Sequence, residues 1–293
     1  MRFTRSATLA ATCSRWRPLR ILRNCLSKSW TSKRGGLRVR ERSRFLTPPI
    51  GTRLMYVAER RAEAVRLAMP DVPAGWLAAG AIIQLMESMG GARMFSGNAE
   101  SYDALVDAPI EAGKFEMFPL SGIKPQIWVV IHGDNWSKKQ VEEDLGRICK
   151  YELKLMEGAP FERYMFILHI GKGAGSGGME HANSTAIGTY SDEYLPSVAA
   201  HEFFHLWNVK RIRPASLEPV DDSKEQYTRV LWFAEGVTNT YGSYTLVRSG
   251  IWSKEQFYAD LSEQITELEG RPANRWQSAE QSSLDAWQIC WTF

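Results

Sequence analysis

Two short apolar runs with a helical segment between them are the feature that most constrains the fold of this chain. The runs are QIWVVIHG (126–133) and RYMFILHI (163–170), short and apolar as buried strands are, the first rich in β-branched residues. Between them, residues 137–156 place apolar side chains near helical spacing, with Ser137 at the expected N-cap. We therefore expect a strand, a helix and a second strand at the centre of the chain.

The segments that follow predict one edge strand and two further helices. GKGAGSGGMEHANSTAIGTY (171–190) is glycine-rich and lacks the GK[ST] ending of a phosphate loop, so it fits a loop that leads into an edge strand. Residues 195–212 and 227–250 predict helices, the second ending at Gly250. With mostly β structure over 55–124, this order of elements predicts an α+β fold.

The charge distribution separates a basic leader from the rest of the chain. Residues 1–50 contain 13 Lys or Arg and one acidic residue, whereas the remainder has 23 basic and 32 acidic residues. The leader, 1–54, is rich in Arg and Ser as transit peptides are, but a mis-assigned start or a disordered tail explains it equally well. We predict two domains after it, a β-rich one over 55–124 and a larger one over 125–293.

Composition argues against several classes of protein. The longest apolar run, GWLAAGAIIQLM (75–86), is shorter than the ~20 residues that cross a bilayer, so we expect no transmembrane segment. Basic residues gather only in the leader, without a nucleic-acid-binding module, so we expect no nucleic-acid partner. Arginines interrupt every candidate apolar region of a secretory signal, which favours the cytoplasm over the periplasm or secretion. The four cysteines lack CxxC spacing, and we expect Cys149 to be buried on a helix.

HEFFH at 201–205 is the pattern that points to chemistry. His201 and His205 lie one helical turn apart, so both imidazoles can reach one metal ion. Glu202 points about 100° away from His201 around the helix, where its carboxylate can accept a proton from a water that the metal activates. The alternative is a helix whose histidines are satisfied in the core. With only five histidines in the chain, a chance match is improbable.

A catalytic zinc ion takes three protein ligands and keeps a fourth position open. No third histidine follows at HExxHxxGxxH spacing, so a carboxylate from another helix remains. Glu235 stands among apolar and aromatic residues in LWFAEGVTNTY, where an isolated carboxylate needs a partner. Glu218 and Glu225 lie in a polar connection and are poorer candidates, and an exposed Glu235 is the alternative. We predict one Zn²⁺ per chain, held by His201, His205 and Glu235.

Three blocks of sequence resemble one known family. HEFFHLWNVKRIRP, WFAEGVTNTY and the upstream GGMEHANST resemble the glycyl aminopeptidases, zinc metallopeptidases of the thermolysin-like gluzincin group that usually carry a PDZ domain. The resemblance runs from about Val72 to the last residue. It implies a thermolysin-like zinc metallopeptidase catalytic domain after a partial β-rich N-terminal domain, with Glu202 as general base. Because members of the family are much longer, we expect a truncated member whose catalytic domain is incomplete at the C-terminus.

The resemblance also implies a substrate site. An extended peptide can add to the predicted edge strand through backbone hydrogen bonds, and glycines let it come close. Glu180 resembles the amine-binding glutamate of the GxMEN motif, in which His181 here replaces asparagine; a surface position after a glycine turn is the alternative. Tyr241 and Tyr244 are candidates for the residue that stabilises the oxyanion, although packing explains them equally well. The substrate-binding candidates are Gly177, Gly178, Met179, Glu180 and His181.

We therefore expect a zinc-dependent aminopeptidase that removes small N-terminal residues, Gly or Ala, from peptides with a free N-terminus. Two alternatives stay open. One is a catalytically impaired fragment or peptide-binding pseudo-peptidase, and the other is a thermolysin-type endopeptidase.

Overall fold

The computed structural model describes residues 16–17, 45–46, 54, 56–69, 72–73, 75–87, 93–218, 220 and 226–289. Two compact units make up the chain: Met1–Met117 with Asp222–Lys224, and Phe118–Asp221 with Glu225–Phe293. The predicted leader, 1–54, lies almost entirely outside the described residues, as do Cys13, Cys25 and Cys290.

Short antiparallel strands form the first unit. One sheet has the order β4-β7-β6, another has the order β2-β8-β5, and β1 pairs with β3. Leu67, Phe95 and Leu105 are buried at the centre of its core. The prediction of mostly β structure after residue 55 is confirmed. The elements are β1 (Trp16–Arg17), β2 (Phe45–Leu46), β3 (Tyr56–Val57), β4 (Val65–Met69), β5 (Leu77–Ala79), β6 (Ile83–Glu87), β7 (Arg93–Ala99), the short helix α2 (Tyr102–Val106) and β8 (Glu111–Gly113).

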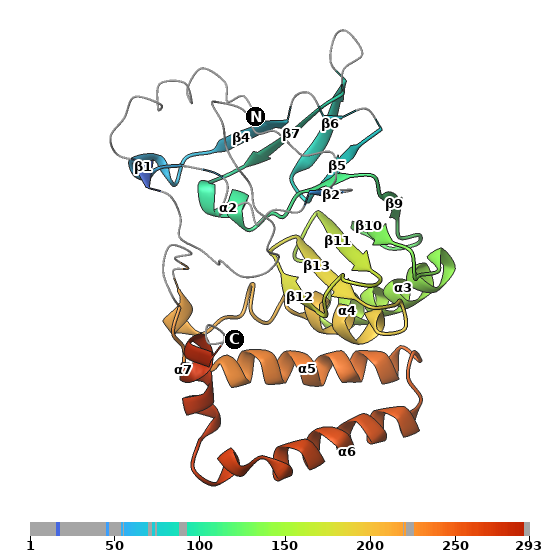
Figure 1. The fold of residues 1–293 in the computed structure, drawn as a ribbon, viewed down its shortest axis with the longest axis vertical. Helices are drawn as coiled ribbons and strands as arrows, with labels where there is room; N and C mark the ends of the chain where they lie inside the picture. Colours follow the sequence, from blue (N-terminus) through green and yellow to red (C-terminus); the bar gives the residue numbers. More distant parts are fainter. Residues whose placement is uncertain are drawn as a thin grey trace. The chain divides into compact units, whose positions relative to one another are not determined.

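The second unit is built on a five-stranded sheet of order β12-β13-β11-β10-β9. Its central strands β10 and β11 run parallel from Gln126↔Arg163 to Gly133↔Ile170 and are almost wholly buried, as the two apolar runs predict. The edge strand β12 runs antiparallel to β13. Helices α3 and α4 pack their apolar residues on the sheet (Figure 1). The strands are β9 (Glu116–Pro119), β10 (Gln126–Gly133), β11 (Arg163–Ile170), β12 (Gly177–Glu180) and β13 (Ser184–Thr189).

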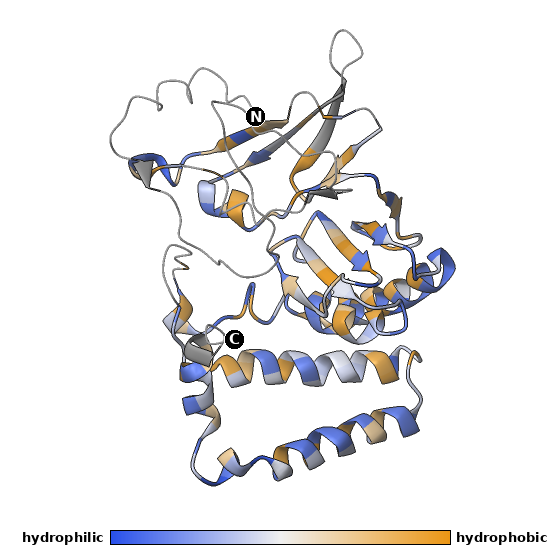
Figure 2. Cartoon of the chain, in the orientation of Figure 1, coloured by the Kyte–Doolittle hydropathy of each residue, from blue (hydrophilic) through white to orange (hydrophobic). Residues whose placement is uncertain are grey.

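Further helices complete this unit. Figure 1 shows α5 beside α4, and α6 beyond α5. No residue of α6 is buried, and in Figure 2 polar residues alternate with apolar ones along it. Within the described residues, no helix is both long and apolar enough to cross a membrane. The helices are α3 (Lys138–Leu155), α4 (Leu195–Phe204), α5 (Leu231–Arg248), α6 (Lys254–Gly270) and α7 (Ala279–Ile289), with short 3-10 turns at Ala58–Arg60, Ala215–Leu217 and Pro272–Arg275.

The predicted strands at 126–133 and 163–170 and the α+β class are confirmed, and Cys149 is buried on α3. The helix predicted over 195–212 is too long, because α4 ends at Phe204 and the chain turns after it. Arg211 holds that turn by donating to the carbonyl oxygens of Pro160 and Ala182, at 2.8 and 2.9 Å. These distant partners give the segment a conformation that its local sequence does not predict.

Candidate metal centre

Helix α4 carries the HEFFH segment and is apolar on most of its surface. Leu195, Ala199, Ala200 and Phe203 are at most 1% exposed between the sheet and α5. Burial of this kind fixes the helix on several sides, so its polar side chains have little freedom of position.

Helix α5 crosses α4 closely at the first histidine. A Cβ added at Gly242 would lie 3.3 Å from the backbone nitrogen of His201 and 3.4 Å from its Cα atom. This glycine therefore allows the close approach of the two helices. The approach brings Glu235, near the start of α5, to the histidines of α4.

The three predicted ligands converge. Nε2 of His201 lies 3.0 Å from Nε2 of His205, and Oε2 of Glu235 lies 3.2 and 3.5 Å from these nitrogens. A tetrahedral zinc ion with bonds of about 2.0–2.2 Å holds its ligand atoms about 3.3–3.5 Å apart. The donor types and their spacing therefore fit a zinc ion after shifts of a few tenths of an ångström.

A buried network orients His205. Its Nδ1 atom lies 2.7 Å from the carbonyl oxygen of Asn208. Thr238 donates to the same carbonyl oxygen at 3.1 Å and accepts a hydrogen bond from the Asn208 amide at 3.0 Å. With Nδ1–H donating to Asn208, the lone pair of Nε2 faces the other donors, as a metal ligand requires.

The negative charge of Glu235 suits the binding of a cation. Burial alone raises the pKa of Glu235, but hydrogen bonds from His201 and His205 outweigh it and lower this pKa to about 2. Burial alone lowers the pKa of His205, but its contact with Glu235 outweighs this and raises it. The Glu235 carboxylate therefore carries the negative charge that a cation bound here would neutralise.

Glu202 lies beside the three donors but is not a member of the group formed by His201, His205 and Glu235. Its side chain is buried, and burial, together with Glu180 and Glu235, raises its pKa to about 7 against the opposing effect of the two histidines. Donor atoms of Glu180, Glu202 and His205 all lie within 4.8 Å of one another. The structure thus brings Glu180, from the edge strand, to the same centre.

The other predicted site residues have contacts outside the donor cluster or are exposed. Met179 is 54% exposed, and the backbone N–H of His181 donates to Ser184 at 2.9 Å. The ring of Tyr241 stacks on Phe204 at 4.7 Å, and the ring of Tyr244 packs on Phe257 at 5.9 Å. Their roles in substrate binding and oxyanion stabilisation stay predictions.

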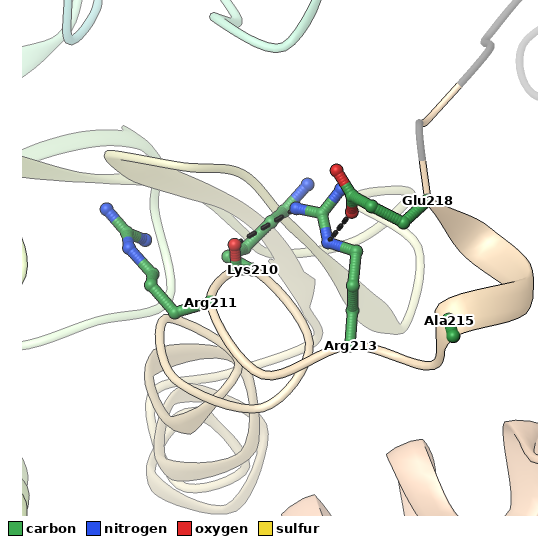
Figure 3. Close-up of a pocket in the computed structure, with 5 residues that line it drawn as sticks. All are labelled: Lys210, Arg211, Arg213, Ala215 and Glu218. Atoms are coloured by element: carbon green, nitrogen blue, oxygen red, sulfur yellow. Dashed lines mark hydrogen bonds and ion pairs between the residues drawn. The ribbon is translucent and has the colours of Figure 1, made fainter.

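An open pocket of about 620 Å³ lies beyond the end of α4, lined by Lys210, Arg211, Arg213, Ala215 and Glu218 (Figure 3). Arg213 donates to the carbonyl oxygens of Val209 and Lys210 and forms an ion pair with Glu218 at 3.3 Å. Arg211 is bound to backbone carbonyl groups. Both guanidinium groups thus have partners within the chain, so the chemistry is assigned to the donor cluster rather than to this pocket.

The sequence predicted the three donors that the structure brings together, but not the groups that orient His205. Asn208 lies within the HEFFHLWN block, three residues after His205, and this spacing was its only signal. Thr238 lies three residues after Glu235 on α5, on the side that faces α4. A small β-branched polar residue inside a helix is not by itself a signal of metal binding.

The chain resembles known peptidases. Residues 195–292 match the M61 glycyl aminopeptidase family. An aminopeptidase N family protein from Idiomarina loihiensis superposes with a TM-score of 0.70 at 28% identity, covering 85% of this chain and 44% of that protein. An M1 zinc metallopeptidase from Deinococcus radiodurans has a TM-score of 0.48 at 15% identity, over 76% of this chain and 48% of that protein. A search of curated proteins gives no match.

The family match confirms the resemblance to the glycyl aminopeptidases. The matched segment, 195–292, contains HEFFH and Glu235. The chain spans less than half the length of the two solved structures.

Proposed function

We propose that this chain, which matches the M61 glycyl aminopeptidase family over residues 195–292, is a zinc-dependent aminopeptidase acting on peptides with small N-terminal residues. The observation that carries the proposal is the spacing of the three donor atoms, 3.0, 3.2 and 3.5 Å, which fits one tetrahedral ion. His201, His205 and Glu235 would hold the ion. The preference for Gly or Ala rests on the family alone.

When bound, zinc supplies a Lewis acid that polarises the scissile carbonyl and makes water nucleophilic at neutral pH. Glu202 is placed to accept the proton of that water and to return it to the leaving amine. A nearby cation lowers the pKa of a carboxyl group, so zinc, when bound, would favour the ionised form of Glu202 that accepts a proton. Asn208 and Thr238 keep His205 in the tautomer that leaves Nε2 free.

The edge strand is proposed to bind the substrate. β12 has one backbone edge that is not paired within the sheet, where an extended peptide can add as a further strand. The Glu180 carboxylate, close to Glu202 and His205, is placed to bind the α-ammonium group of the peptide. This contact would favour substrates with a free N-terminus. It would therefore make the enzyme an aminopeptidase rather than an endopeptidase.

The test is hydrolysis of alanyl and glycyl chromogenic amides by the purified full chain with one equivalent of zinc. We expect turnover that Glu202→Gln reduces by orders of magnitude while zinc content stays unchanged. Cleavage of an N-terminally blocked peptide would favour the endopeptidase. A chain that binds zinc and peptide without turnover would be the pseudo-peptidase, and the aminopeptidase proposal would then be wrong.

A further inference from the structure

A side chain at Gly178 would overlap Glu202. An ideal Cβ atom at Gly178 lies 2.4 Å from Cγ, 2.5 Å from Cδ and 2.5 Å from Oε1 of Glu202. Carbon atoms in contact lie about 3.5–4.0 Å apart, so these distances are not tolerated. The Glu202 side chain occupies the space that any other residue at position 178 would need.

The backbone at Gly178 does not itself require glycine. Gly177 has a φ of +121°, in the region that other residues rarely adopt, whereas Gly178 is not among the residues with positive φ. Gly178 pairs with Ile187 as an ordinary antiparallel strand residue. The need for glycine at 178 therefore comes from its neighbour in space, Glu202.

The backbones of strand β12 and helix α4 cannot easily move apart. Strand β12 is held to β13 by the ladder that runs from Gly177↔Gly188 to Glu180↔Thr185. Thr185 adds a hydrogen bond to the carbonyl oxygen of Met179 at 3.0 Å. Glu202 is 6% exposed and precedes Phe203, which is fully buried on α4. The distance between strand and helix is therefore fixed from both sides.

The alternation of side chains along β12 explains how the strand serves the site. Residues two apart in a strand share a face, so Gly178 and Glu180 both face α4, whereas Met179, between them, is 54% exposed. The strand thus leaves a gap opposite Glu202 and places a carboxylate next to that gap.

We infer that Gly178 is a positioning residue. Because it has no side chain, the Glu202 carboxylate can lie in the space next to it, beside the proposed metal ligands. The contact is a property of the fold. Its consequence for catalysis rests on the proposed function. A methyl group at 178 would force Glu202 into another rotamer or lift the strand.

A double-mutant cycle in the full chain tests the contact without any measure of activity. Gly178→Ala should lower the midpoint of thermal unfolding by about 3–8 °C, as expected for overpacking. In a Glu202→Ala background, the same change should shift the midpoint by no more than about 1–2 °C. Gly146→Ala on α3, where an added Cβ meets nothing within 4 Å, is the matched control. Additive shifts would overturn the inference.

Folding failure is also informative. If Gly178→Ala does not fold but the double variant does, the clash with Glu202 is demonstrated. If the double variant also fails to fold, Glu202 is not the cause and the inference is wrong.

Kinetics test the positioning role. With zinc content unchanged, Gly178→Ala should lower kcat about a hundredfold and leave KM within about threefold, because a displacement of about 1 Å at the reacting groups has an effect of this size. An unchanged kcat would show that Glu202 is not positioned by Gly178. If the unmodified chain has no turnover, the proposed function fails, whereas the coupling in thermal stability is unaffected.

Discussion

The Nδ1 atom of His205 lies 2.7 Å from the carbonyl oxygen of Asn208, three residues further along the chain. The side chain of Thr238, fully buried on α5, donates to the same carbonyl oxygen and lies 3.3 Å from Nδ1. A histidine that binds a metal through Nε2 needs such an acceptor at Nδ1 to fix its tautomer and its ring plane. The packing of α5 on α4 thus brings both a donor, Glu235, and a group that orients a second donor, His205.

Thr238→Val should weaken zinc binding about tenfold to a hundredfold, because it removes the hydroxyl group and nearly keeps the shape. Competition with a chromogenic chelator measures the dissociation constant. Thr240→Val on the same helix is the control, since its hydroxyl donates to the carbonyl oxygen of Gly236 and does not contact the donor cluster. Equal affinities of the two variants would contradict the orienting role of Thr238.

Glu235→Ala should remove most of the zinc and leave the secondary structure intact. The carboxylate is one of three donors, whereas the helix that carries it is fixed by Ala234, Thr238 and Leu246, all at most 2% exposed. Elemental analysis after dialysis, with circular dichroism as a check on folding, measures both quantities. As a control, Glu263→Ala, which changes an exposed residue of α6, should retain one equivalent of zinc per chain. Full zinc occupancy in Glu235→Ala would exclude Glu235 as a ligand.

The parts of the structure that the sequence predicts are those set by local periodicity. The run at 126–133 coincides with β10, and one helical turn between His201 and His205 brings their Nε2 atoms within 3.0 Å of each other. Glu235 was predicted from its apolar neighbours as a buried carboxylate; its side chain is instead 49% exposed, and it nevertheless contacts both histidines.

The parts that could not be predicted depend on contacts between distant segments. Glycine at 178 is consistent with a turn, a bulge or a close substrate, and only the position of α4 shows that Glu202 fills its space. The early end of α4 likewise depends on the contacts of Arg211 with Pro160 and Ala182, some 30 to 50 residues away in sequence.

Glu180→Ala should raise KM for substrates with a free amine, with zinc content unchanged. A charge-assisted contact contributes about 1.5–3 kcal/mol, so kcat/KM should fall about tenfold to a hundredfold. Kinetics on an alanyl amide measure the change. Glu162→Ala, an exposed glutamate outside the donor cluster, is the control. Unchanged kinetics at confirmed zinc occupancy would exclude the amine-binding role of Glu180.

Glu152→Gln should make the protein more stable at neutral pH. Glu152 is fully buried on α3, and burial raises its pKa well above the usual value, with only partial opposition from the Thr245 hydroxyl. Between the pKa of the unfolded chain, about 4.5 or slightly below, and the raised pKa of the folded state, the folded protein holds a proton that the unfolded chain has lost. Stability therefore falls as pH rises through this window, by up to about 1.4 kcal/mol per pH unit.

A glutamine at position 152 is neutral at every pH, so the variant does not lose stability through this window. Urea unfolding at pH 5 and pH 8 should show a stability difference between variant and unmodified chain that grows with pH, to about 1–3 kcal/mol in favour of glutamine. Glu143→Gln, at a half-exposed position on the same helix, is the matched control. If the difference for Glu152→Gln is the same at both pH values, the buried carboxyl group does not hold its proton in the folded state.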